Sequence, residues 1–353
     1  MAFHVWQDVP AHAAVDKLIA PVIGFGWAGV DLFFVLSGFL ITRILFEAIE
    51  APHYFRAFYA RRLLRTFPLY YLALVAVLAL PALAGRRLVE ENAWWFLLHA
   101  SNIMTVLEGY PRRIVVHFWS LSIEQQFYLF WPVALRFCRT RARMLRLCAG
   151  LLAGALALRA AWWIGGHAEP YQIYNFTLTR MDALAAGGLL SLWLAATGDS
   201  ARRLRVVGAI GLCALTAVAV SLWLDGPNHL RWGTWGETLG FSGVALGCGS
   251  LVGWSQLTGP ERPLNRFLAR PTLVSLGKYS YAMYIFHIWV DAAARAARLH
   301  PATSGATIAG TATLPMLLYF AGFLAVTSAI ALASWSLFEE RFLACKRHFQ
   351  FGM

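Results

Sequence analysis

His4 lies in the run Phe-His-Val-Trp, at the start of a largely apolar chain. A neutral imidazole can take a proton from a hydroxyl group near neutral pH, and this makes His4 a candidate general base. The alternative is a histidine that is hydrogen-bonded for packing alone. The sequence around this residue does not separate the two roles.

A second polar group occupies the run Trp119-Ser-Leu-Ser-Ile-Glu-Gln-Gln-Phe-Tyr128. Ser120, Glu124 and Tyr128 are spaced four residues apart and share one face of a helix. A charged side chain in a bilayer costs at least ~2.5 kcal/mol on insertion scales, so this face should line a polar cavity. Glu124 could serve as a base, as an orienting partner of His4 or as a ligand for a hydroxyl substrate. The alternative is a purely structural hydrogen-bonding role.

A third group is the run Arg61-Arg-Leu-Leu-Arg-Thr-Phe-Pro68, in which Arg62 and Arg65 lie on one face of a helix. Two guanidinium groups that face the same way suit phosphate groups. Pro68 should end this amphipathic stretch or lie in the first turn of the next helix. Arginines at a cytoplasmic membrane face need no ligand, and this is the alternative.

The stretch Gly29–Ile41 carries further polar and small residues in an apolar setting. We expect Ser37 and Gly38 to serve close helix packing, since small residues do so in membranes. Asp31 is a candidate cavity residue. Arg180 and Asp182 could neutralise one another.

Ser280, Tyr284 and His287 are spaced to share one helix face, and His287 is a further candidate cavity residue. Glu339 closes the last apolar stretch among basic residues and should be structural. The five cysteines and the histidines show no zinc-binding spacing, so no metal site is predicted.

The composition places the chain in a lipid bilayer. Apolar residues make up 59% and charged residues only 14% of the 353 residues, whereas soluble domains carry about 25% charged residues. The net charge of +12 comes from arginine clusters between apolar runs. This is the pattern of cytoplasmic loops, and no nucleic-acid partner is needed to explain it.

The apolar segments and basic clusters together predict an all-α integral membrane protein with about ten transmembrane helices. We expect the helix that ends near His4 to be incomplete at Met1. The segment 90–108 holds several polar residues. If it crossed the membrane, the basic cluster after segment 116–137 would lie outside the cytoplasm, so we expect 90–108 to be re-entrant or interfacial. The C-terminus then lies in the cytoplasm.

We expect residues 1–353 to form a single domain of the inner membrane with no soluble part. The apolar segments are 26–46, 66–85, 90–108, 116–137, 144–164, 180–197, 205–224, 237–257, 273–298 and 312–338.

These motifs together resemble the acyltransferase-3 family of multi-pass membrane acyltransferases. The resemblance rests on the runs around His4, Gly29–Ile41, Arg62-x-x-Arg65-x-x-Pro68, Trp119–Tyr128 and Ser280–His287, in family order along the chain. It implies ten membrane helices and the transfer of an acyl group, often acetyl, from a coenzyme A thioester. The acceptors it implies are hydroxyl groups, typically of cell-surface or exported carbohydrates.

The resemblance also implies that His4 is a catalytic histidine and that Arg62 and Arg65 bind the donor. Combined with the residue patterns, it leads us to expect Arg43 near the donor. Ser120, Ser122 and Tyr128 could donate to the developing oxyanion. We expect Trp119, Asp31 and His287 to line the same cavity.

Two other functional classes are compatible with polar residues at mid-membrane. One is a transporter or flippase for a glycolipid or small solute, and the other is a non-catalytic membrane scaffold. Binding of coenzyme A discriminates an acyltransferase from a transporter, because a transporter has no reason to recognise that donor.

Overall fold

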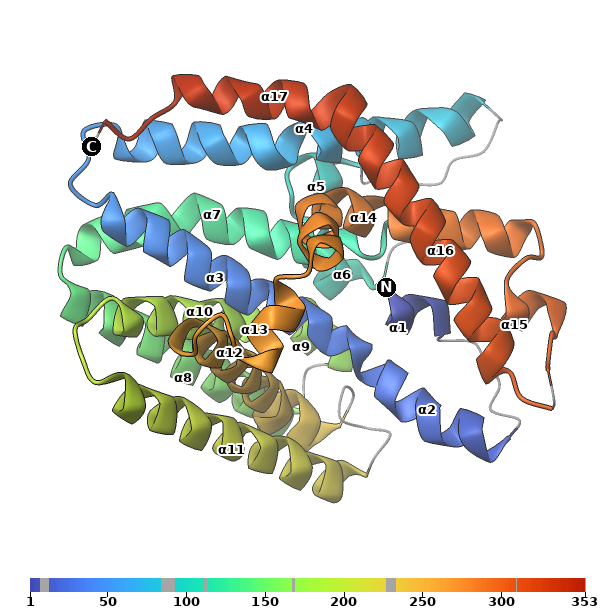
Figure 1. Cartoon of the computed structure of the whole chain (residues 1–353), viewed down its shortest axis with the longest axis horizontal. Helices are drawn as coiled ribbons and strands as arrows, with labels where there is room; N and C mark the ends of the chain where they lie inside the picture. Colours follow the sequence, from blue (N-terminus) through green and yellow to red (C-terminus); the bar gives the residue numbers. More distant parts are fainter. Residues whose placement is uncertain are drawn as a thin grey trace.

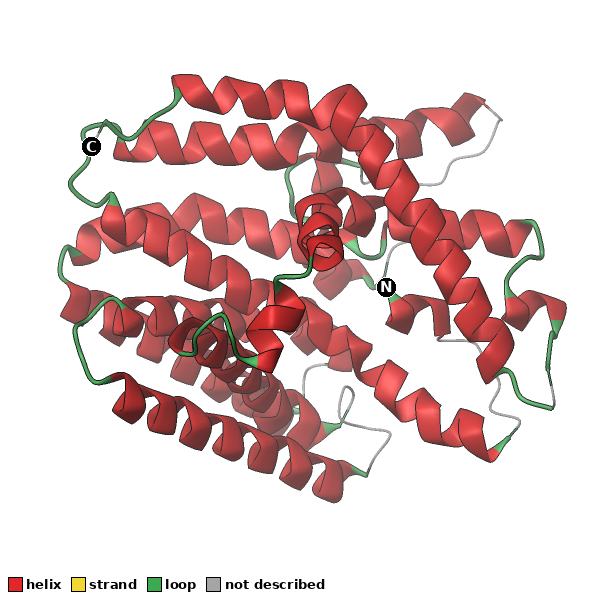
Figure 2. Ribbon diagram, viewed as in Figure 1, coloured by secondary structure: helices red, strands yellow, loops and turns green. Residues whose placement is uncertain are grey.

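The computed structural model describes residues 1–6, 13–83, 93–110, 113–166, 169–226, 233–308 and 310–352. Within these ranges the chain is helical and contains no β-strand (Figure 2). The all-α prediction is therefore confirmed for this part of the chain. The longer helices are α2 (Ala14–Gly24), α3 (Gly29–Glu47), α4 (Tyr54–Leu83), α7 (Phe118–Cys138), α8 (Arg141–Gly165), α10 (Met181–Leu194), α11 (Ser200–Asp225), α12 (Phe241–Leu257), α14 (Pro271–Ala296) and α16 (Thr313–Ser334).

Short helices join or cap these elements. They are α1 (Ala2–Trp6), α5 (Trp94–Leu97), α6 (Ser101–Glu108), α9 (Pro170–Asn175), α13 (Pro263–Leu268), α15 (Pro301–Ser304) and α17 (Glu340–Ala344). Figure 1 shows α3, α4 and α7 running side by side through the molecule, with α8, α10, α11 and α12 packed on one flank and α16 on the other.

Five helical stretches within the described ranges are long and apolar enough to cross a membrane: 14–47, 54–79, 141–165, 200–225 and 313–348. The chain is thus a multi-helix membrane protein, whereas the count of ten spans stays a prediction. In the segment 90–108, residues 90–92 lie outside the described residues. The remainder forms α5 and α6, of four and eight residues. A span needs about twenty residues, so neither crosses a bilayer alone, and the re-entrant placement also stays a prediction.

Helix α4 runs from Tyr54 to Leu83 without a break at Pro68. The prediction that Pro68 could lie in the first turn of a new helix is therefore wrong, whereas the end of the amphipathic stretch at Pro68 stays a prediction. This continuity matters for the site, because one helix carries Arg62 and Arg65 and then passes into the apolar interior.

Helices α3 and α10 pack backbone against backbone. A Cβ atom on Gly38 would lie 1.9 Å from the carbonyl oxygen of Leu184, and one on Gly187 would lie 2.0 Å from that of Val35. Only glycine permits this approach, and the packing role predicted for Gly38 is confirmed. The contact fixes the depth of α3 against the rest of the bundle.

Two ion pairs are buried beside this contact. The guanidinium group of Arg180 lies 2.6 Å from the Asp31 carboxylate, and that of Arg159 lies 2.7 Å from Asp182, with all four side chains at most 1% exposed. Arg180 and Asp182 were predicted to neutralise one another, but each has its ion-pair partner on another helix. Arg180 precedes α10 and Asp182 lies in its first turn, and their side chains reach α3 and α8, respectively.

Candidate active site

One cavity of about 590 Å³ collects most of the predicted chemistry. Its volume falls in the range of small-molecule sites. Helices α1, α3, α4, α7 and α14 all contribute to its wall, so segments from both ends of the chain meet there. The predicted site residues that line it are His4, Arg62, Arg65, Trp119, Ser120, Glu124 and Tyr128.

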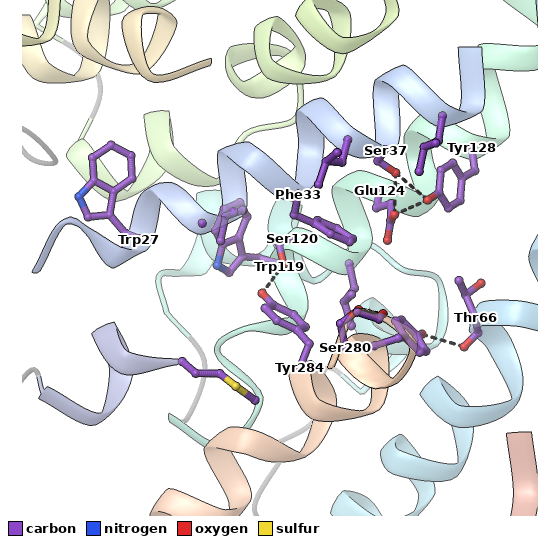
Figure 3. A pocket seen from close by; sticks show the side chains of 18 of the residues that line it. Trp27, Phe33, Ser37, Thr66, Trp119, Ser120, Glu124, Tyr128, Ser280 and Tyr284 are labelled. Carbon is purple, nitrogen blue, oxygen red and sulfur yellow. Dashed lines mark hydrogen bonds between the residues drawn. The ribbon is translucent and has the colours of Figure 1, made fainter. Parts of the chain in front are cut away.

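Glu124 is buried at the wall formed by α7 and α3. The hydroxyl of Ser37 donates to its carboxylate at 2.8 Å, and the hydroxyl of Tyr128 donates to the same oxygen. The hydroxyl oxygens of Ser37 and Tyr128 are 2.7 Å apart. Figure 3 shows the three side chains converging. A buried carboxylate needs such donors, and they fix the direction in which its second oxygen points.

Two further hydroxyls face each other one turn away. The Ser120 and Tyr284 oxygens are 2.5 Å apart (Figure 3). Each hydroxyl also lies within hydrogen-bond distance of the His117 carbonyl, at 3.2 and 3.1 Å. This pair joins α7 to α14 across the cavity wall. Of the three α14 residues predicted to share a face, Ser280 and Tyr284 line the cavity and His287 does not.

The two arginines of α4 reach the cavity from its other side. The guanidinium of Arg62 lies over the Tyr128 ring, 5.2 Å from its centroid. Arg65 donates to the Lys278 carbonyl at 3.3 Å and lies 3.9 Å from the Glu339 carboxylate. Glu339 therefore anchors Arg65, in keeping with its predicted structural role. Arg62 keeps its charge directed towards the cavity and the Glu124 cluster.

His4 is half-buried on α1 and lines the cavity. The carbonyl of the next residue, Val5, accepts hydrogen bonds from His300 at 2.9 Å and Arg295 at 3.4 Å. Carbonyls at the end of a helix lack intrahelical partners, and basic side chains commonly satisfy them. These two side chains hold the short helix that presents His4.

The order of these motifs along the chain, together with their meeting in one cavity, agrees with the family pattern. The sequence matches the acyltransferase-3 family, described as an acyltransferase domain, over residues 1–335. The chain belongs to this family. No solved structure matches it significantly.

Curated relatives of this acyltransferase-3 chain are named as O-acetyltransferases. Peptidoglycan O-acetyltransferase OatA of Listeria monocytogenes is 31% identical over 204 residues, which are 51% of this chain and 32% of the relative. "Putative peptidoglycan O-acetyltransferase YrhL" of Bacillus subtilis is 33% identical over 203 residues, or 51% of this chain and 31% of the relative. A "Putative O-acetyltransferase" of Staphylococcus aureus is 26% identical over 294 residues, or 75% and 46%. The matched part of the chain thus spans 31% to 46% of the length of these relatives.

Some predicted residues of the acyltransferase-3 site lie elsewhere in the structure. Arg43 is exposed and pairs with Glu47 at 2.9 Å, away from the cavity lining. The hydroxyl of Ser122 is buried against Ser101 of α6 at 2.8 Å. Asp31 forms its buried ion pair with Arg180 and does not line the cavity. His287 is buried behind the wall, where it contacts His4 without lining the cavity itself.

The sequence-based reasoning missed two features of the site. It assigned Ser37 to packing with Gly38, but Ser37 faces Glu124 because adjacent helical residues point in different directions. It did not single out His117, which precedes α7 and lies next to His287. The signal was present in the run His117-Phe-Trp-Ser, since a histidine opens a helix that is already rich in polar side chains.

Proposed function

We propose that the chain transfers an acetyl group from acetyl-coenzyme A to a hydroxyl of a cell-surface or exported carbohydrate. The observation that carries this proposal is that Arg62 and Arg65 open into the same cavity as His4 and Glu124. The two arginines can then bind the phosphates of the same donor molecule whose thioester lies within reach of the candidate base His4 and the carboxylate of Glu124.

In the proposed reaction the arginines hold the phosphates of the donor, and the thioester lies between them and His4. His4 takes the proton of the acceptor hydroxyl, the oxygen attacks the thioester carbonyl carbon, and a carbon–oxygen bond forms. The carbon–sulfur bond then breaks, and the proton passes to the departing thiolate. His4 acts either as this base or, by direct attack on the thioester, as a transient acyl carrier.

The hydroxyls of Ser120 and Tyr284 are the candidate donors to the oxyanion that forms in this step. Fixed donors in a site with little water stabilise developing charge strongly, and removing one costs about 10²–10³ in rate in well-studied enzymes. Glu124 is the candidate ligand for the acceptor hydroxyl or orienting partner of His4, with Ser37 and Tyr128 holding it in place.

The names of the relatives suggest peptidoglycan as the first acceptor to test. The experiment uses the protein in lipid nanodiscs, acetyl-labelled coenzyme A and soluble peptidoglycan fragments, with release of free coenzyme A and labelling of the glycan as readouts. We expect transfer by the wild type and its loss in His4→Ala and Glu124→Ala. Full transfer by either folded variant would remove that residue from the mechanism.

A further inference from the structure

Three histidines from distant parts of the chain lie in a row next to the cavity. The ring centroids of His4 and His287 are 5.3 Å apart, and those of His287 and His117 are 5.1 Å apart. They come from α1, α14 and the residue before α7. Only His4 lines the cavity, while His287 and His117 are each 1% exposed.

The position of the proton on His287 follows from its neighbour. Its Nδ1 lies 2.6 Å from the carbonyl oxygen of Tyr284. A carbonyl only accepts, so Nδ1 carries the hydrogen, and in the neutral ring Nε2 presents a lone pair. Nε2 is buried and has no hydrogen-bond partner within the described ranges.

His117 is held in the same manner by the next residue of α14. Its Nε2 donates to the carbonyl of Ile285 at 3.1 Å, which leaves Nδ1 as the acceptor, again buried and without a partner in the described part of the chain. Two consecutive carbonyls of α14 therefore fix two neighbouring rings as hydrogen-bond acceptors.

A buried acceptor without a donor is unfavourable, because it has lost its hydrogen bond to water and gained none in the protein. It gains a donor when a neighbouring ring takes up a second proton, because an imidazolium donates from both nitrogens. The ring next to His287 on the cavity side is His4. Its centroid distance of 5.3 Å allows a small rotation to bring ring nitrogens into contact.

We propose that His287 is a positioning residue for His4, whose imidazolium donates to the His287 Nε2 as acyl transfer proceeds. The interaction orients His4 and stabilises its charged form, the part that a third group plays for the base in a catalytic triad. His117 packs edge-on against His287 and limits its rotation. This inference rests on the proposed role of His4 as the base of the reaction.

In the described part of the chain, few other ionisable groups face these rings. Besides His4 and His117, those near His287 are the hydroxyl of Tyr284 and the amino group of Met1. The acidic residue one turn further along α14, Asp291, bonds Arg295 at 2.7 Å and Tyr319 at 3.0 Å. Helix α16 packs on α1 through Met316, Phe323 and Tyr319. The carboxylate of Asp291 is thus engaged by other groups, whereas the His287 imidazole lies beside the His4 ring.

The test measures the protonation of His4 without any need for turnover. Diethyl pyrocarbonate modifies neutral imidazole, and peptide mass spectrometry of the full chain in nanodiscs gives the rate at His4 as a function of pH. Without its acceptor the charged form of His4 is less stable. In His287→Ala we therefore expect the midpoint of His4 modification to move to lower pH by about one unit, a tenfold change in proton affinity.

Two variants separate positioning from mere packing. His287→Gln retains an acceptor oxygen near the Nε2 position and should restore most of the wild-type midpoint. His99→Ala removes another buried histidine, which stacks on Phe67 outside the cavity lining, and should leave the midpoint unchanged. An unchanged midpoint in folded His287→Ala, or an equal shift in His99→Ala, would overturn the proposal. If the wild type transfers no acetyl group, the proposed function fails, but this titration still reports whether His287 acts on His4.

Discussion

Glu124 illustrates how a carboxylate is accommodated where lipid surrounds the protein. Its side chain is 3% exposed and accepts from hydroxyls on two helices. The guanidinium of Arg62 lies over the ring of Tyr128, 5.2 Å from its centroid. Because neutral donors hold Glu124 and no salt bridge to it is found among the described residues, its second oxygen can accept from a substrate hydroxyl.

Ser37 should matter more for transfer than for folding. Ser37→Ala removes one of the donors to Glu124, and we expect acetyl transfer to fall about tenfold, in line with a hydrogen bond to a charged group of about 1.5–3 kcal/mol. Donor binding should be retained. The measurement is initial rate against acetyl-coenzyme A concentration.

Ser122→Ala is the matched control for this variant. It also removes a buried serine hydroxyl, but that hydroxyl bonds Ser101 and not a cavity residue. Its rate should stay within about twofold of wild type. If the two variants lose activity equally, the assignment of Ser37 to the site is incorrect.

At the scale of elements, the glycine contact between α3 and α10 sets where Ser37 meets Glu124. Gly38→Ala would place a methyl group 1.9 Å from the Leu184 carbonyl oxygen, so α3 must move outward. We expect a lower melting temperature in detergent and reduced transfer. Gly187→Ala should have the same two effects, since its new Cβ atom would lie 2.0 Å from the Val35 carbonyl oxygen.

Gly150→Ala, on α8, provides the comparison. A Cβ atom there meets nothing within 4 Å, and alanine favours a helix over glycine by up to about 1 kcal/mol. Its melting temperature should be unchanged or higher. A Gly38→Ala protein as stable as Gly150→Ala would contradict the close packing of α3 on α10.

The ion pair between α8 and α10 gives a second prediction for the elements. Arg159→Ala leaves Asp182 buried without its ion-pair partner, and two neutral donors remain, the Ser242 hydroxyl at 2.9 Å and the Ala183 backbone amide at 3.0 Å. Breaking a buried pair typically costs about 3–5 kcal/mol, and thermal unfolding in detergent should show it. Glu261→Ala breaks an exposed pair with Arg266 and should change little. Equal losses of thermal stability in the two variants would mean that the buried pair does not stabilise the packing of α8 on α10.

The sequence predicted features within a single helix better than contacts between helices. The role of Gly38 and the shared face of Ser120, Glu124 and Tyr128 follow from helical spacing alone. The partner of Arg180 does not, because Asp31 is 149 residues away and only the packing of α3 on α10 brings it near. Arg159 escaped notice as a single charge within an apolar segment.

At the scale of the whole molecule, several connections between helices gather at one end, and the predicted topology places this end in the cytoplasm. The connections α3–α4, α7–α8 and α10–α11 and the C-terminus lie at the same end of the molecule (Figure 1). These connections carry or adjoin three of the arginine clusters. We expect cysteines placed at His53, Thr140 and Gly198 to react with a membrane-impermeant maleimide only from the cytoplasmic side. Labelling of any of them from outside intact cells would refute this topology.

The central claim is that the cavity binds a coenzyme A thioester through Arg62 and Arg65, and calorimetric titration of the nanodisc-embedded protein with acetyl-coenzyme A tests it most directly. Arg202 and Arg205 have the same spacing on the exposed start of α11 and do not line the cavity, so Arg202→Ala/Arg205→Ala is the matched control. We predict saturable binding by the wild type and the control, and binding at least tenfold weaker in Arg62→Ala/Arg65→Ala. No binding by the folded wild type, or equal losses in the two double variants, would contradict the account and favour a transporter.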